Sequence, residues 1–492
     1  MNRDELLDNL CSCSSGTFDR VVAYLKPPAG TLSSERNSQA TRAAELLIWA
    51  EHSDGPSLEK LEKCYRRAIG EQPAKVPIKH SKRSLWEVIL TSLLISGLTT
   101  GLVLGMRSLG LLESLELEAY DHLLQLRPAE QLDEHILVVE VNQEDINEYG
   151  SYPLEDTKLA ELISKLEQYQ PRVIGVDMHR YTKRGQGREQ LIAQFRENSD
   201  IITVCKYGSQ SKDFYPPSEF SKEQLRNQVG FSNLPLDGAG KQVRTIRRQL
   251  LSYAPKLSES PHPCSTPFSF SLQLAYRFLD KEGIQPMTLN DDDEWEFGGV
   301  VFKPLTVHFG GYQQLNGQSD QIMINYRSSS LPGRKVTFKQ VLEGQVNRDD
   351  VKDRIVLIGM NVEKSGDIHD TPYREMLGVW IQAHMVSQII RAVIDERPLI
   401  WVLPQWRGVL WGETFWILAW SSVGGLIVWR FQSRLKLILL ICGITTLVLH
   451  QICLVILSTS GGWMPLVPSG LGLIFTTVSS SIAYKYLFKH KQ

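Results

Sequence analysis

Two apolar runs in the middle of the sequence lead into polar side chains that could bind a ligand. The run RVIGVDM at 172–178 ends in Asp177 and Met178, and His179 follows directly. In open α/β sheets, ligands bind in the crevice at the carboxyl ends of the strands, where a carboxylate can accept hydrogen bonds. Asp177 and His179 are therefore candidate ligand-binding residues. The alternative for Asp177 is a structural acid that caps a turn.

A second candidate group follows the run RIVLIG at 354–359. Asp370 and Thr371 precede Pro372, and Tyr373 follows it. The proline ring fixes its own φ and restricts the residue before it, which makes this segment rigid. The segment could lie over the crevice of the first group, or it could be a turn that packs Tyr373. We include Asp370, Thr371 and Tyr373 among the candidate ligand-binding residues.

Basic side chains form a third group. Arg244 lies close in sequence to Arg247 and Arg248, and guanidinium groups bind anions through paired hydrogen bonds. Arg244 is therefore a candidate for contact with an anionic ligand, and a solvated strand edge is the alternative. Asp121 and Arg127 could pair with each other or with the body of the domain that follows them.

Signatures of catalysis and of metal binding are absent from the sequence. It contains no GxxxxGK[ST] phosphate loop, no HExxH zinc motif and no GxSxG nucleophile elbow. Cys11-x-Cys13 has no second pair at zinc-ligand spacing. The net charge of -2 gives no indication of nucleic-acid binding. We expect no enzymatic activity, no metal or other cofactor, and no nucleic-acid partner.

Strands and helices alternate around the candidate residues. Asp156 is expected to cap a helix that Pro171 stops, and a later helix is expected from Trp380 to Ile394. A strand, a helix and a strand in this order favour a right-handed parallel pair. Continuous apolar runs of this length are typical of buried strands, and they predict strands at 135–142, 172–178, 201–205, 321–326 and 354–359. Residues 108–400 are therefore expected to form a mixed α/β domain.

Four stretches are long and apolar enough to cross a membrane as helices. They lie at 88–106, 409–429, 435–457 and 465–487. We therefore expect one transmembrane helix within 84–107 and three within 408–488, on either side of the α/β domain. Glu413 is the one acid inside these stretches, and it either lies at the membrane interface or marks a functional contact.

Most of the basic residues that flank the expected spans lie on one side, although Arg107 and Arg407 weaken the contrast. Lysines and arginines lie at 75–83, 430–436 and 489–491, whereas glutamates follow the first span at 113–118. Because basic flanks prefer the cytoplasm, the N-terminus is expected in the cytoplasm and residues 108–400 outside it. The location implied is the plasma (inner) membrane, with several passes.

Residues 1–78 are expected to form short helices at 4–10, 18–25, 40–51 and 57–69, packed as a small bundle. The order PPAGTL, RAAELLIWAE, GPSLEKLEKCYRRAI resembles an effector-associated domain, a small death-like helical adaptor of bacterial signalling and conflict systems. The resemblance implies homotypic contact with a cytoplasmic effector protein. The alternative is a helical cap on the first span.

The middle of the chain resembles the second type of the CHASE family of extracytoplasmic sensory domains. The matching stretches are YDHLLQLRP at 120–128, ILVVEVN at 136–142, VIGVDM at 173–178, VRTIRRQL at 243–250, MINYR at 323–327, and RIVLIG with DTPY and GVWIQAHMVSQII at 354–390. With the flanking spans and GWMPLVPSG at 462–470, the resemblance covers residues 84–488. It implies a sensor with one span before it and about three after it.

The resemblance predicts a membrane receptor for an unknown extracytoplasmic ligand, and by analogy a homodimer. We expect the signal to pass through residues 1–78 or through a separate membrane partner. Two other functions remain open, namely a scaffolding membrane protein without a ligand and an extracytoplasmic enzyme of unfamiliar type. If residues 108–400 are exported, Cys205 and Cys264 could form a disulfide, and two buried free thiols are the alternative.

Overall fold

The chain forms two compact units, Met1–Arg83 and Ser84–Gln492, in a computed structural model. The residues that the structure describes are 1–70, 85–149, 152–209, 211–237, 245–253, 262–315, 319–328, 331–362, 366–406, 408–431 and 434–489.

The first unit is a bundle of four helices within its described residues. They are α1 (Arg3–Ser12), α2 (Ser15–Leu25), α3 (Gln39–Glu51) and α4 (Leu58–Ala68). Asn2, Ser14 and Ser38 cap the first three, because each side chain accepts a hydrogen bond from the backbone of the first turn. Apolar residues from all four helices form one core, which includes Leu10, Phe18, Leu46, Leu47 and Leu61. The helices lie where the sequence predicted them, to within a few residues.

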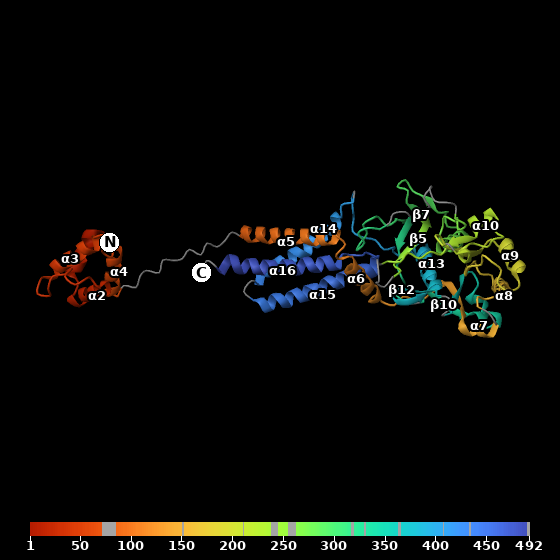
Figure 1. Ribbon diagram of the computed structural model, residues 1–492, viewed down its shortest axis with the longest axis horizontal. Coiled ribbons are helices and arrows are strands. Elements are labelled where there is room, and N and C mark those ends of the chain that lie inside the picture. The colour runs from red at the N-terminus through yellow and green to blue at the C-terminus, as the bar shows by residue number, and fades with distance from the viewer. Residues whose placement is uncertain are drawn as a thin grey trace. The chain divides into compact units, whose positions relative to one another are not determined.

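The second unit contains four helices that are long and apolar enough to cross a membrane. They are α5 (Leu85–Ser108), α14 (Trp411–Phe431), α15 (Leu435–Ser460) and α16 (Leu466–Lys489). They pack side by side, with α14 in contact with the other three (Figure 1). The predicted spans are therefore present as helices.

Small residues let these helices approach closely. A Cβ atom added to Gly424 on α14 would lie 2.5 Å from the backbone oxygen of Leu473 on α16. Hydroxyl groups also join the helices, since Thr100 donates to Ser421 and Thr99 forms a hydrogen bond with Thr476. In a lipid environment, association depends on such close packing and hydrogen bonding more than on the hydrophobic effect.

A six-stranded sheet forms the centre of the α/β body, with the order β10-β1-β11-β2-β3-β4. Every neighbouring pair in it is parallel. The strands are β1 (Asp133–Asn142), β2 (Val173–Asp177), β3 (Ile201–Cys205), β4 (Val229–Phe231), β10 (Gly333–Thr337) and β11 (Ile355–Asn361). The prediction of β1 and β2 as a neighbouring pair is wrong, because β11 lies between them and pairs with both.

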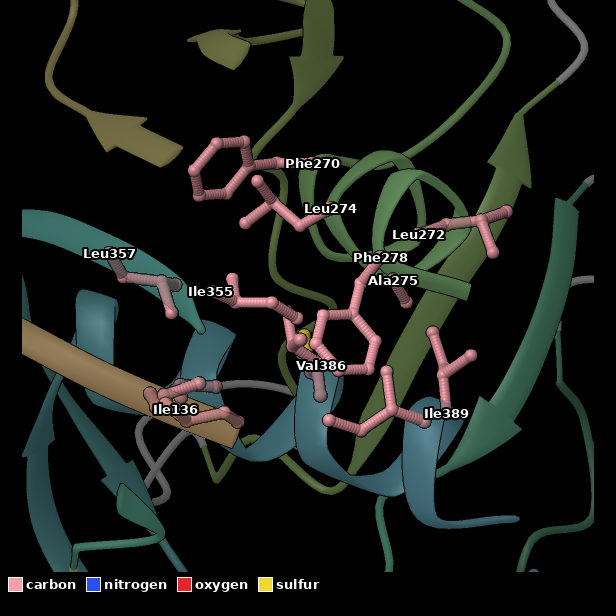
Figure 2. Close-up of a cluster of buried hydrophobic side chains, with 14 of the residues drawn as sticks. Ile136, Phe270, Leu272, Leu274, Ala275, Phe278, Ile355, Leu357, Val386 and Ile389 are labelled. Carbon is pink, nitrogen blue, oxygen red and sulfur yellow. The ribbon is translucent and has the colours of Figure 1, made fainter. Parts of the chain in front are cut away.

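Helices cover both faces of this sheet, which explains why its four central strands, β1, β11, β2 and β3, read as continuous apolar runs. One face packs against α8 (Asp156–Gln168), α9 (Arg188–Glu197) and α12 (Phe338–Leu342). The other packs against α11 (Phe270–Lys281) and α13 (Gly378–Asp395). Figure 2 shows this second core, where Phe278 of α11 lies beside Val386 and Ile389 of α13.

Smaller elements surround the sheet. An antiparallel pair joins β5 (Arg248–Tyr253) to β9 (Ser319–Met323). The strand predicted at 321–326 is therefore placed too late, since β9 ends at Met323. Asp156 is the first residue of α8, and Glu155 takes the cap position predicted for it. The remaining elements are α6 (Glu113–Gln125), α7 (Gln143–Tyr149), η1 (Lys212–Phe214), α10 (Lys222–Asn227), β6 (Thr288–Leu289), β7 (Trp295–Phe297), β8 (Val300–Phe302), η2 (Arg348–Asp350), β12 (Ile368–Thr371) and β13 (Arg374–Leu377).

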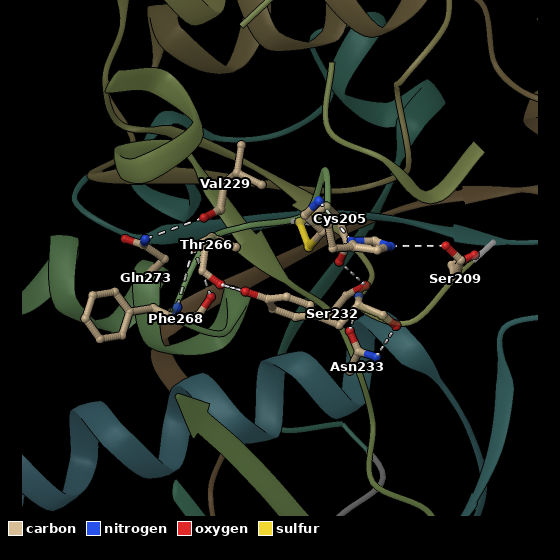
Figure 3. The surroundings of a disulfide bond; sticks show 11 residues. Cys205, Ser209, Val229, Ser232, Asn233, Thr266, Phe268 and Gln273 are labelled. Atoms are coloured by element: carbon tan, nitrogen blue, oxygen red, sulfur yellow. Dashed lines mark hydrogen bonds between the residues drawn. A yellow bond between two sulfur atoms is a disulfide. The ribbon is translucent and has the colours of Figure 1, made fainter. Parts of the chain in front are cut away.

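A disulfide joins Cys205, the last residue of β3, to Cys264 (Figure 3). Their Cα atoms lie 5.6 Å apart, and both residues are fully buried. The Cys264 amide donates to His262, and the Tyr207 hydroxyl donates to the backbone oxygen of Thr266. Of the two alternatives for these cysteines, the structure contains the disulfide.

Candidate ligand site at the strand ends

A cavity of about 410 Å³ lies at the carboxyl ends of β2, β3 and β11, and we call it the strand-end cavity. The parallel arrangement brings these strand ends to one edge of the sheet, which is where α/β proteins bind ligands. Its lining includes Asp177, His179, Arg180, Lys206, Asp213, Phe214, Asp367, His369 and Gln382. The volume lies within the range of small-molecule sites, roughly 300–1,000 Å³.

Two carboxylates occupy one side of the cavity. Asp177 ends β2, and no described residue forms a hydrogen bond or an ion pair with its carboxylate. Asp367 precedes β12, and its Oδ1 lies 3.0 Å from Nε2 of His369. Burial, and after it the charge of Asp367, raises the pKa of Asp177 well above its usual value. The negative charge of Asp367 and the burial of Asp177 therefore both disfavour the ionised form of Asp177.

His179 also lines the cavity, near charged side chains of both signs. Its ring meets the Phe214 ring edge-on, with 4.7 Å between centroids. Burial, and then the positive charge of Lys206, lowers the pKa of His179 to about 4, although Asp367 opposes the change. The neutral ring can donate or accept a hydrogen bond at pH 7, and its buried Nδ1 has no partner among the described residues.

Two nearly buried side chains also reach the cavity with unused polar atoms. Gln382 on α13 is 3% exposed, and its Oε1 has no hydrogen bond to any described residue. Arg180 is 1% exposed, and its nearest carboxylate oxygen, on Asp156, is 3.9 Å away. Burial lowers the pKa of Arg180 to about 10, so the guanidinium is still charged at neutral pH. Unsatisfied groups of this kind are costly and favour a polar ligand.

The structure separates the sequence candidates into two places. Asp177 and His179 line the strand-end cavity, whereas Asp370 and Thr371 line a second cavity of about 770 Å³ beside α6. Tyr373 lines neither, because its hydroxyl donates to the backbone oxygen of Leu124. The prediction that the Asp370–Tyr373 segment could lie over the first crevice is therefore wrong, and the packed turn is what the structure contains.

Most of the arginines that the sequence analysis singled out form ion pairs or hydrogen bonds within the second unit. Arg244 lies outside the described residues. Arg247 forms ion pairs with Asp121 at 2.7 Å and with Asp237 at 3.4 Å, so it is not on a solvated edge. Asp121 thus pairs with the α/β body, and not with Arg127. Arg127 donates to Asn325, Glu130 and the backbone oxygen of Tyr326.

A buried ionic junction joins the membrane helices to the α/β body. Arg107, in the last turn of α5, forms ion pairs with Glu116 at the start of α6 and with Glu413 at the start of α14. Its guanidinium also donates to the backbone oxygen of Gly310. All three side chains are at most 2% exposed. Glu413 therefore lies at the end of its span, as expected for a residue at the membrane interface. It also makes a specific contact there, the buried ion pair with Arg107.

The geometry of Gly310 completes this junction. Its φ is +54°, and a Cβ atom there would lie 2.3 Å from the Trp463 ring, so only glycine fits. Burial raises the pKa of Glu116 to about 7 against the opposing effect of Arg107. The sequence showed Arg107 only as a residue that weakens the charge contrast between the two sides, because its partner Glu413 is 306 residues away.

The sequence model of the CHASE2 domain matches residues 98–426, two-thirds of the chain. The chain belongs to the CHASE2 domain family. The CHASE2 match begins within α5 and ends within α14, so it includes Arg107 and Glu413 at the junction as well as the whole strand-end cavity. CHASE2 domains are sensory, which supports a sensor role for this membrane protein. None of the curated proteins and none of the solved structures matches the chain.

The CHASE2 body offers binding chemistry at its strand ends. Among the described residues, no three His, Cys, Asp or Glu side chains gather closely enough to hold a metal ion. Hydrogen-bond donors and acceptors around the strand-end cavity come from Asp177, Asp367, His369, Lys206 and Arg180. The sequence signal that could have identified Lys206 is its position directly after the apolar run 201–205, where β3 ends, whereas Asp367 lies eight residues after the run RIVLIG and has no such signal.

Proposed function

We propose that the chain is a bacterial membrane receptor whose CHASE2 body lies outside the cytoplasm, in the plasma (inner) membrane. The body binds a small stimulus in the strand-end cavity, and the N-terminal helical unit passes the signal to a separate effector. The protein acts by binding and has no catalytic activity. The observation that carries this proposal is the Arg107 junction, because it links the sensory body directly to two membrane helices.

The junction supports transmission because it is buried and has several partners. Arg107 holds α5, α6, α14 and the Gly310 loop at one point. A ligand can shift such an assembly only if it binds two of its states with different affinity. The hairpin of β12 and β13 connects the cavity to α6 and can transmit such a shift. Asp367, which lines the cavity, precedes the hairpin, and Tyr373 in the turn of the hairpin donates a hydrogen bond to α6.

Two observations support the external location of the body. The Cys205–Cys264 disulfide is typical of oxidising compartments. The connection between α15 and α16 also packs on the body, where Trp463 contacts Tyr120 and Tyr312. This connection carries no charged residue at 458–464, whereas the connection between α14 and α15 is basic. The charge pattern therefore favours a cytoplasmic side opposite the body.

Cysteine labelling tests this orientation. Leu289 in the body is 52% exposed and Ile48 in the first unit is 56% exposed, so cysteines there accept reagents without disturbing a core. In intact cells, a membrane-impermeant maleimide should label Leu289→Cys, and it should label Ile48→Cys only after lysis. Labelling in the reverse order contradicts the proposed orientation and the receptor function with it.

The N-terminal unit is proposed to bind its effector by homotypic contact. Support comes from its compact four-helix core and from exposed apolar residues on it, among them Tyr24 and Ile48. Ile48→Asp in the full chain should abolish effector crosslinking in cells without changing the melting temperature. The matched control Glu51→Asp, on the same helix, should leave crosslinking intact. If Ile48→Asp crosslinks as well as wild type, this surface is not the contact.

A further inference from the structure

Three buried polar atoms at the strand-end cavity have no hydrogen-bond partner among the described residues. They are Oε1 of Gln382, Nε of Arg180 and Nδ1 of His179, and all three side chains line the cavity. Gln382 is 3% exposed and Arg180 is 1% exposed. Buried polar atoms are almost always satisfied in folded proteins, so a ligand with matching groups would gain these hydrogen bonds.

The three atoms need different kinds of partner. Gln382 Oε1 can only accept a hydrogen bond, whereas the Nε–H of Arg180 can only donate one. Because the pKa of His179 is lowered to about 4, its ring is neutral at pH 7, and Nδ1 donates or accepts according to the tautomer. A hydroxyl group both donates and accepts, so this one type of group suits all three atoms. A ligand with several hydroxyls therefore matches them better than a ligand with donors alone or acceptors alone.

The formal charges of the described cavity lining balance. The lining contains three aspartates and three basic residues, namely Asp177, Asp213, Asp367, Arg180, Arg184 and Lys206. Asp213 and Arg184 form an ion pair with each other at 3.0 Å. An anionic ligand would face aspartates and a cationic ligand would face basic side chains, and such like-charge contacts are costly. A neutral ligand avoids both costs.

Asp177 adds a further acceptor for hydroxyl groups. It ends β2 at the cavity, and no described residue forms a hydrogen bond or an ion pair with its carboxylate. A hydroxyl can donate to a carboxylate without adding a charge, and a hydrogen bond to an ionised acceptor is stronger than a neutral one. Apolar side chains also line the cavity, among them Phe214, Leu234 and Met360. They suit the C–H groups of a compact ring that carries hydroxyls.

We propose that the strand-end cavity binds a small neutral polyol of the monosaccharide class, whose hydroxyls form hydrogen bonds with Gln382, His179, Arg180 and Asp177. This inference rests on the proposed function, because it names the ligand class of the same cavity. The volume of about 410 Å³ admits one small molecule of this kind.

Calorimetric titration of the full chain in lipid nanodiscs tests the proposal. The sugar probes are D-glucose, D-galactose, D-mannose and D-ribose, and the charged probes are L-alanine, succinate and putrescine. At least one sugar should bind, and it should bind at least about tenfold more tightly than each charged probe, because the charged probes bring like charges together. If no sugar binds, or if a charged probe binds as tightly as the best sugar, the proposal is wrong.

Two variants test whether the sugar binds in this cavity. Gln382→Met and His179→Phe each remove one of the unpartnered atoms, and each should weaken sugar binding at least about threefold, as expected for one lost hydrogen bond. The matched controls Gln168→Met and His52→Phe change exposed residues outside the cavity lining and should leave the affinity unchanged. If neither folded variant loses affinity, the sugar binds elsewhere and the proposal is wrong. If a variant does not fold, the other variant and the wild-type comparison of sugars with charged probes decide.

Failure of this inference differs from failure of the proposed function. Tight binding of L-alanine or succinate that depends on Gln382 would overturn the neutral polyol while the receptor function stands. Sugar binding together with reversed cysteine labelling would support the neutral polyol and overturn the proposed orientation.

Discussion

Replacement of Arg107 by methionine should destabilise the second unit strongly. Methionine fills much of the same space, but it leaves the carboxylates of Glu116 and Glu413 without their cation and the Gly310 oxygen without a donor. Both carboxylates already have one buried oxygen without a partner among the described residues. Breaking a buried ion pair in this way typically costs about 3–5 kcal/mol.

Protonation sets an upper limit on this cost and gives it a pH dependence. An unpaired buried carboxylate can take up a proton, which costs about 1.4 kcal/mol for each pH unit above its usual pKa. The ordinary pKa of Glu116 is 4.5, so the destabilisation that its unpaired carboxylate can cause is at most about 5 kcal/mol at pH 8 and below about 1 kcal/mol at pH 5. The destabilisation by Arg107→Met should therefore be large at pH 8 and small at pH 5.

Reversible unfolding in lipid bicelles, followed by tryptophan fluorescence, measures this effect. The control Arg334→Met removes an arginine that is 52% exposed and paired with Asp350, so it should cost about 0–1 kcal/mol. The triple variant Arg107→Met, Glu116→Gln, Glu413→Gln should recover most of the lost stability, because no buried charge remains. A loss below about 1 kcal/mol at pH 8, or one that is the same at both pH values, refutes the reasoning.

Three further predictions concern the second unit. Because the pKa of Glu116 is raised to about 7 from 4.5, the folded state keeps a proton that the unfolded state has released, and this contribution to stability is lost as pH rises from about 4.5 through 7. In pH-dependent unfolding, Glu116→Gln should show less of this decline than wild type, and an identical profile contradicts the assignment. Cys205→Ser with Cys264→Ser should lower the free energy of unfolding by about 2–4 kcal/mol, and non-reducing peptide mapping of wild type should recover the linked pair. Gly424→Leu should destabilise the helix bundle by at least about 1–3 kcal/mol in the same unfolding assay. The control Gly443→Leu should not, because an added Cβ atom at Gly443 meets no atom within 4 Å. Equal effects of the two substitutions would show that Gly424 does not lie on the face of α14 that packs against α16.

The sequence alone determined the elements whose signals are local. A span needs only a long apolar run, and the four helices formed where such runs occur. β1, β2, β3 and β11 were recognisable because burial on both faces makes a parallel strand continuously apolar. The helices of the first unit followed from their apolar spacing. The CHASE2 resemblance joined these local signals, and the family match over 98–426 confirmed it.

Tertiary structure decided what depends on contacts between distant residues. β11 lies between β1 and β2 although more than a hundred residues separate it from either, and no local pattern encodes that order. The same reason explains the junction, since Arg107 and Glu413 are 306 residues apart. It also explains the candidate site: Asp367 and Asp370 are three residues apart, yet they line different cavities. Residue type and spacing show which side chains could bind a ligand, but only the packed backbone decides which of them face one another.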